Sequence, residues 1–86
     1  MKIYHVETQQ DYDELMIELE EKGLKWLSGH EPTHFDGFKD YGKDACVYEE
    51  YDEISISGVE YFKVFHSDET LIEYKAKGEK NVKHRM

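Results

Sequence analysis

Two histidines and two carboxylates gather in one short stretch of the sequence. His30 and His34 flank Glu31, and Asp36 follows two residues after the second histidine. Imidazole nitrogens and carboxylate oxygens are ligands that zinc accepts. Pro32 stands between the histidines and disfavours a continuous helix, so their spacing does not place them on one helix face. We therefore interpret them as solvated loop histidines and predict neither a metal site nor a cofactor.

The only thiol in the chain belongs to Cys46. A catalytic cysteine reacts as the thiolate, which positive neighbours stabilise. Asp44, Glu49 and Glu50 lie nearby in the sequence, and their negative charge raises the pKa of a thiol. The apolar run 45–47 is typical of a strand in which cysteine is a small buried hydrophobe. A lone cysteine forms no internal disulfide, which favours a reducing cytosol for so short a chain.

Carboxylates are abundant, with 20 Asp and Glu among 86 residues. General acid and base catalysis needs two carboxyl groups that face each other across a cleft in different environments. A chain of this length offers little wall for such a cleft. Glycine-rich phosphate loops, Ser-His-Asp signatures and Cys-x-x-Cys pairs are absent from the sequence. The sequence therefore predicts no catalytic residues and a protein that is not an enzyme.

Four carboxylates in the first quarter of the chain are candidates for binding a partner. Glu14, Glu18 and Glu21 recur at spacings of three and four, which places them on one outer helix face beside Asp13. Most such rows are solvated faces that keep a protein soluble. The functional alternative is that a row of carboxylates imitates a phosphate backbone and binds the basic groove of a nucleic-acid-acting protein.

A second candidate site is aromatic. Aromatic side chains are enriched in ligand pockets and interfaces, although a short chain also needs them for its core. If the segment 30–41 closes over a small polar or nucleotide-like molecule, possible contacts come from Trp26, His30, His34, Phe38 and Tyr41. We expect such a ligand binder to act as a homodimer.

The charges of the two ends of the chain differ. Residues 75–86 hold five Lys or Arg against one Glu, a net charge of +4, whereas the other 74 residues hold six against nineteen, a net charge of −13. A body this acidic repels nucleic acid and favours basic partners. The first residues of the chain lack the apolar run of a signal peptide, and no run is long enough to span a membrane. We therefore expect a cytoplasmic protein without membrane or direct nucleic-acid contacts.

One long amphipathic helix is expected to position the acidic row. Thr8 followed by Asp11 forms an approximate capping box, so the helix begins near residue 9. Lys22 suits the negative C-terminal pole, and Gly23 can close the helix in the left-handed conformation. The apolar stripe that must pack on a sheet consists of Tyr12, Leu15, Met16 and Leu19.

Short runs of β-branched and aromatic residues predict the strands. We expect strands over 2–6 and 24–28, the second of which carries Trp26. The segment 29–42 starts at a glycine, yet it is too aromatic for a solvated linker, so it is expected to be ordered and to cover core.

The second half of the sequence predicts an antiparallel strand pair and a closing strand. The pair comprises 45–51 and 53–57, joined by a tight turn near Asp52. The run 70–76 is apolar on both of its faces, which suits an internal strand.

The fold class follows from the order of these elements. Ser57 and Glu60 form a second capping box and favour a short helix over 58–65, with a strand as the alternative. The order is β-α-β-loop-β-β-α-β, a two-layer α+β domain with an antiparallel or mixed sheet of four or five strands. Residues 1–76 form this single domain, and 77–86 form a basic, disordered tail.

These segments together resemble small uncharacterised phage and prophage proteins. Members carry an acidic helix, a Gly-x-Lys-Trp-x-Ser-Gly segment, a Pro-Thr turn, an aromatic stretch and a closing strand. Many have a tryptophan in the loop, where this chain has Phe35 or Phe38. The resemblance implies a phage or prophage origin and brings no catalytic residues. It covers residues 3–75 and is carried by 7–15, 22–29, Pro32-Thr33, Tyr41, 45–47, Ile54 and 72–74.

The expected function combines charge, size and resemblance. We expect a non-enzymatic accessory protein that binds a basic host protein through its acidic surface, in the host cytosol, and inhibits a nucleic-acid-acting or defence factor. The alternative is the small-ligand binder described above.

Overall fold

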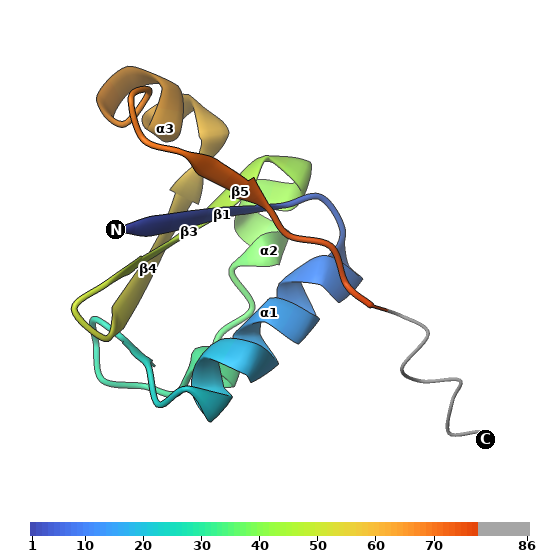
Figure 1. Ribbon diagram of the computed structural model, residues 1–86. Helices are drawn as coiled ribbons and strands as arrows, with labels where there is room; N and C mark the ends of the chain where they lie inside the picture. The colour runs from blue at the N-terminus through green and yellow to red at the C-terminus, as the bar shows by residue number, and fades with distance from the viewer. Residues whose placement is uncertain (78–86) are drawn as a thin grey trace.

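The computed structural model describes residues 1–77, and its elements follow the predicted order (Figure 1). The predicted tail 77–86, apart from Lys77, lies outside the described residues. Short 3₁₀ turns, η1 (Pro32–His34) and η2 (Gly42–Asp44), interrupt the central loop. The helices and strands are β1 (Lys2–Val6), α1 (Gln9–Glu21), β2 (Lys25–Trp26), α2 (Phe38–Tyr41), β3 (Ala45–Glu50), β4 (Glu53–Gly58), α3 (Val59–Phe65) and β5 (Leu71–Glu73).

The five strands form one mixed sheet in the order β2-β4-β3-β1-β5. Strand β3 pairs antiparallel with both β1 and β4, whereas the outer strands β2 and β5 pair parallel with their neighbours. The predicted α+β class is therefore confirmed. The predicted internal position of the last strand is wrong, because β5 is a three-residue edge strand. Its apolar residues do not require two neighbouring strands: Leu71 packs towards α3, and Ile72 is 37% exposed.

Helix α1 covers one face of the sheet, below the strands in Figure 1. The Thr8 hydroxyl accepts the backbone N–H of Asp11 at 3.1 Å and so caps the helix, as predicted. Gly23 closes the helix end with φ of +87°. The predicted stripe is buried against Tyr4, Val6, Val47 and Ile54 of the sheet. Burial of this stripe is what fixes α1 to the sheet.

The central loop is ordered and anchored, as predicted. Trp26 donates its indole N–H to the carbonyl of Pro32 at 3.1 Å. Strand β2 is shorter than the predicted 24–28, because the Gly29 N–H returns to the Trp26 carbonyl at 2.7 Å with a φ of +93° at Gly29. The chain turns there and leaves the sheet.

Strands β3 and β4 form the predicted antiparallel hairpin. Tyr51 and Asp52 join them with φ of 55° and 65°, the left-handed values of a type I′ turn, whose twist matches that of the strands. Such turns favour Asn and Gly, so turn chemistry does not account for a tyrosine here.

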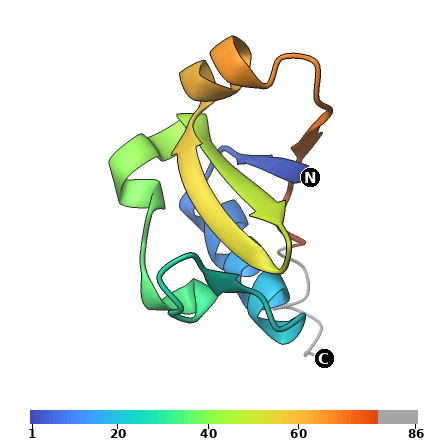
Figure 2. The ribbon, with the colours of Figure 1, turned by 90° about the vertical axis from the view of Figure 1, so that its left-hand side faces the viewer.

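Helix α3 lies on the opposite side of the sheet from α1 (Figure 2). The predicted helix over 58–65 is confirmed, whereas the predicted capping box is wrong. Gly58 is the N-cap without a side-chain hydrogen bond, because Ser57 belongs to β4 and its hydroxyl is buried on the sheet. Val59 and Phe62 pack on a small cluster of Ile3, Cys46 and Tyr48.

Candidate functional site

The four carboxylates predicted to bind a partner do not form an unoccupied row. The Glu18 carboxylate accepts the Tyr74 hydroxyl at 2.5 Å, and Glu14 accepts the backbone N–H of Lys77 at 3.1 Å. Asp13 accepts the side-chain amide of Gln9 at 2.9 Å. Glu21 is exposed at the end of α1. The structure therefore places part of the chain's own C-terminal segment on this row.

Asp11 belongs to the same helix face and is 6% exposed. It accepts the backbone N–H of Ala76 at 2.8 Å. Burial raises the pKa of this carboxyl, but hydrogen bonds from the Ala76 N–H and from Thr8 outweigh burial, so its pKa is below the usual value. The sequence identified Asp11 only as a helix-capping residue, because its partner stands 65 positions away.

His5 joins three parts of the fold that the sequence could not connect. Its Nδ1 lies 2.6 Å from a Glu73 carboxylate oxygen on β5, and its Nε2 lies 2.7 Å from the Lys43 carbonyl in η2. Both partners are acceptors, so the ring satisfies both only as a doubly protonated imidazolium. Burial lowers the pKa of His5, but the Glu73 carboxylate and the Lys43 carbonyl outweigh it, so the pKa is raised.

The predicted aromatic ligand site is partly assembled. The rings of His30 and His34 stack with centroids 4.4 Å apart, and the ring of Phe35 lies 6.0 Å from that of Trp26. Phe35 contacts both histidines, at 5.1 and 4.7 Å, although the sequence had not identified it as a site residue. The remaining two predicted residues lie elsewhere: Phe38 packs on the buried Tyr12, and Tyr41 is exposed beside Gly58.

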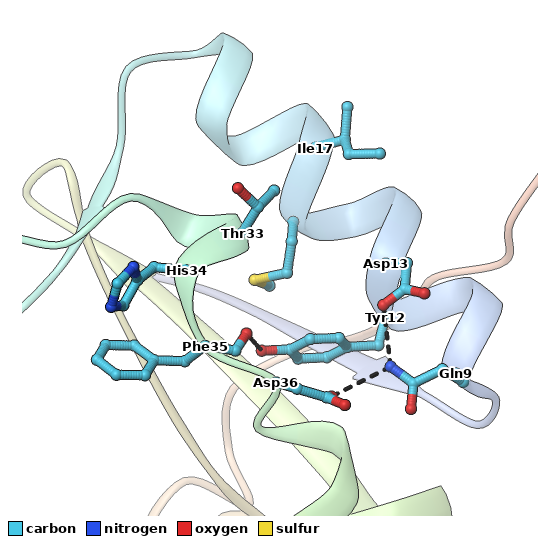
Figure 3. A pocket seen from close by; sticks show the side chains of 9 residues that line it. Gln9, Tyr12, Asp13, Ile17, Thr33, His34, Phe35 and Asp36 are labelled. Atoms are coloured by element: carbon cyan, nitrogen blue, oxygen red, sulfur yellow. Dashed lines mark hydrogen bonds between the residues drawn. The ribbon is translucent and has the colours of Figure 1, made fainter.

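Hollows flank Phe35 on both sides. The hollow in Figure 3 has a volume of about 560 Å³ and lies between α1 and the loop. Its rim carries Asp13 and Asp36, which are bridged by the Gln9 amide at 2.9 and 3.1 Å. The second, of about 550 Å³, lies towards Trp26 and α2. The carboxylate rim of the first hollow suits an aliphatic or flat body bearing a cation and disfavours phosphate, whereas the second hollow is lined by Lys39 as well as Asp36 and Asp40. The first hollow is lined by Gln9, Tyr12, Asp13, Met16, Ile17, Thr33, His34, Phe35 and Asp36.

A third hollow, of about 340 Å³, lies on the side of the sheet that carries α3. Tyr48 forms its floor, and the rings of Tyr61 and His66 lie 6.0 and 5.4 Å from the Tyr48 ring. Glu50 and Glu53 stand at its rim, at the tip of the β3–β4 hairpin. We call this surface the hairpin face, defined by Met1, Leu27, Tyr48, Glu50, Tyr51, Glu53, Ile54, Ser55, Tyr61 and His66.

The hairpin face exposes large apolar side chains. Tyr51 is 88% exposed, Leu27 68% and Tyr61 47%. Val64 and Phe65 of α3 are also exposed, and the Phe65 ring lies 4.8 Å from that of Tyr61. This surface was not predicted, because the sequence placed Tyr51 at the end of a strand, whereas it lies in the turn with its ring outward.

Two buried hydroxyls lie beneath the hairpin face. Within residues 1–77, neither the Tyr48 hydroxyl nor the Ser57 hydroxyl makes a hydrogen bond of good geometry. Burial raises the pKa of the Tyr48 phenol, and the neighbouring Ser57 hydroxyl partly opposes that effect. Buried hydroxyls without a well-formed hydrogen bond cost free energy of folding.

Cys46 is fully buried in β3, as its apolar neighbours predicted. Burial, with the negative charges of Glu73 and Asp44, raises the pKa of its thiol to about 11. The thiol is therefore protonated at neutral pH and inaccessible to a substrate.

Among residues 1–77, no three His, Cys, Asp or Glu side chains are grouped so that they could hold a metal ion. No helix in that part of the chain has the length and apolar character needed to cross a membrane. Comparison with family models, curated proteins and solved structures found no match.

Proposed function

We propose that this chain is a small, non-enzymatic protein-binding domain whose hairpin face binds a basic segment of another protein. The observation that carries the proposal is the hairpin face itself, where exposed Tyr51, Leu27 and Tyr61 surround a hollow rimmed by carboxylates. Apolar anchors within a charged rim are the usual composition of a protein interface.

The charges of the hairpin face define the partner. Within residues 1–77, the Glu50 and Glu53 carboxylates have neither a hydrogen-bond nor an ion-pair partner, and Asp52 stands between the strands that carry them. Unpaired carboxylates around an apolar hollow attract Lys and Arg and repel acidic partners. In contrast, the acidic row of α1 is engaged by the chain's own C-terminal segment. The hairpin face is therefore the better candidate for the acidic binding surface.

Tyr51 supports the same conclusion. A bulky residue at φ of 55° is strained, and such strain costs on the order of 1 to 3 kcal/mol. The ring gains no burial in return, because it is 88% exposed. Tyrosine is a frequent hot spot of protein interfaces. We propose Tyr51 as the central contact of the partner, and, on the resemblance to phage and prophage proteins, we propose that this partner is a host protein.

Affinity capture from a bacterial lysate, at low and high salt, tests the proposal. We expect a captured protein whose binding weakens as salt rises, because exposed charges are screened. Tyr51→Asn should abolish capture while the hairpin persists, because asparagine tolerates positive φ. Tyr41→Asn is the matched control, since Tyr41 is also exposed but lies outside the hairpin face.

A charge control separates the hairpin face from α1. Glu50→Lys with Glu53→Lys should abolish capture, whereas Asp13→Lys with Glu21→Lys makes the same change of charge on α1 and should leave capture intact. Capture that survives the hairpin variants, or no captured protein at either salt concentration, would contradict the proposal.

A second candidate function, small-ligand binding, is favoured by the hollows beside Phe35. The carboxylate rim of the first hollow points to a cationic ligand rather than a nucleotide. Trp26 lines one of them, so its fluorescence is a direct reporter. A change in Trp26 fluorescence on titration with polyamines but not with nucleoside phosphates would support this candidate function. No change with either class of ligand would rule it out.

A further inference from the structure

The last described residues lie across β1 and α1 as one extended segment. We call residues 71–77 the strap. Its first part, β5, pairs parallel with β1, and the backbone N–H of Tyr74 continues the ladder by donating to the His5 carbonyl at 3.0 Å. In Figure 1 the strap runs from β5 alongside β1 towards the start of α1.

Each of the four strap residues beyond β5 donates one hydrogen bond to a different carboxylate. Tyr74 donates its hydroxyl to Glu18, and Lys75 pairs with Glu7 at 2.5 Å. The backbone N–H groups of Ala76 and Lys77 bond to Asp11 and Glu14 at 2.8 and 3.1 Å. Four neighbouring carboxylates thus accept from four consecutive residues, an arrangement that combines backbone pairing with charge recognition.

The acceptor surface is negatively charged and so favours positively charged segments. Glu7, Asp11, Glu14 and Glu18 stand at spacings of four, three and four residues, so their like charges repel when nothing lies among them. The strap offsets that repulsion with Lys75, whose ammonium pairs with Glu7, and carries a second positive charge on Lys77. A segment that lacked basic residues would add no compensating charge.

The strap is also the least buried part of the sheet. Ile72, Glu73, Lys75 and Lys77 are exposed, and none of the strap residues is fully buried. Edge segments with few buried contacts open at a lower free energy than the core. Of the strap residues, Leu71 and Tyr74 pack against the hydrophobic clusters, so we expect the strap to open at a lower free energy than β1, β3 or α1.

We propose that β1 and α1 form a docking surface for an extended basic segment of another protein, and that the strap is its built-in occupant. An incoming segment adds parallel to β1 and takes over the four carboxylates as the strap leaves. This surface is separate from the hairpin face, so either proposal can fail without the other.

His5 links the occupancy of the surface to pH. The groups that face its ring are Glu73 from β5, the Lys43 carbonyl from η2 and the neighbouring Glu7, with Cys46 paired opposite on β3. Protonated His5 holds Glu73 and thereby the strap, whereas neutral His5 keeps only one of its two hydrogen bonds. A docking peptide in which glutamine replaces the strap's glutamate should therefore bind more tightly at pH 8 than at pH 6, and His5→Gln should remove that difference.

The test uses the full chain and a labelled peptide of the strap's own sequence, Thr-Leu-Ile-Glu-Tyr-Lys-Ala-Lys, with fluorescence anisotropy. We expect weak binding to the unmodified chain, since the strap competes. Lys75→Ala removes the pair with Glu7 and should tighten peptide binding about two- to fivefold, the scale of an exposed ion pair. Tyr74→Phe, which keeps the ring against Tyr4 but loses the hydroxyl, should tighten it too. A peptide with both lysines changed to glutamate should not bind.

Displacement of the strap by the peptide would change the NMR signals of the strap amides, whereas a strap that only stabilises the fold would stay in place. With the protein isotopically labelled and the peptide unlabelled, NMR signals of the Tyr74, Ala76 and Lys77 amides should move to positions typical of a free chain on titration, while those of β3 stay in place. The proposal would be overturned if the peptide did not bind to the Lys75→Ala and Tyr74→Phe variants. It would also be overturned if the peptide bound without any shift of the NMR signals of the strap amides.

Discussion

Loss of one hydroxyl, in Tyr12→Phe, should loosen the loop that carries Phe35. The Tyr12 hydroxyl donates to the Phe35 carbonyl at 3.2 Å and accepts the backbone N–H of Gly37 at 3.0 Å (Figure 3 draws the first). The ring itself stays packed, because Phe fills the same space between α1 and the sheet. Each neutral hydrogen bond is worth about 1 kcal/mol, so we expect a loss of about 2 kcal/mol of unfolding free energy.

For a chain of this length, that loss lowers Tm by about 8 to 16 °C. Thermal unfolding followed by circular dichroism measures it, and amide hydrogen exchange should show faster exchange at Gly37 than at β3. Tyr41→Phe is the matched control, since the Tyr41 hydroxyl bonds to nothing within residues 1–77 and its removal should change stability by less than about 0.5 kcal/mol. A Tm for Tyr12→Phe within 2 °C (roughly the change expected of a neutral surface substitution) would refute the idea that this hydroxyl anchors the loop.

Three further predictions concern titratable groups. Because the pKa of His5 is raised in the folded state, protonation of His5 stabilises the fold fully below the ordinary histidine pKa of 6.5, and this contribution is lost as pH rises through the folded-state pKa. Urea titrations at several pH values should therefore show that the difference in unfolding free energy between the wild type and His5→Gln shrinks over that pH range. Because the pKa of Asp11 is lowered in the folded state, ionised Asp11 stabilises the fold above the ordinary aspartate pKa of 3.8, and this contribution is lost as pH falls through the folded-state pKa. Asp11→Asn should therefore reduce the dependence of the unfolding free energy on pH in the acid range. An unchanged dependence would count against the hydrogen bond to Ala76. Cys46, buried and with a pKa of about 11, should react with a thiol reagent only through unfolding, at a rate that rises with denaturant; rapid labelling of the native protein would disprove its burial.

Local signals predicted most of the fold. The three-and-four spacing of the α1 stripe, the Thr8 cap and the two runs around Asp52 each depend on residues close in sequence, and the structure confirms all of them. The capping box at Ser57 failed because the same local pattern also suits a strand end, and pairing with Cys46 decided in favour of the strand.

The candidate sites were harder to predict, because they depend on contacts between distant residues. His5 and Glu73 are 68 positions apart, and the residues around each of them in the sequence give no sign of the contact. The acidic row of α1 was visible in the sequence, but its occupation by the strap was not. Trp26, His30 and His34 did come together, since β2 and the loop that follows it hold all three, whereas Phe38 packs on Tyr12 at the edge of the core.

The position of β1 in the sheet has a consequence for synthesis of the protein. This strand precedes every other strand in the chain, yet it lies between β3 and β5, which are made later. On the ribosome β1 therefore emerges without either neighbour, and its backbone groups stay unpaired until β3 has been translated. The β3–β4 hairpin, whose strands are adjacent in sequence, can form as soon as it emerges. The sheet then grows from its middle towards the earliest strand, and β5 completes it last.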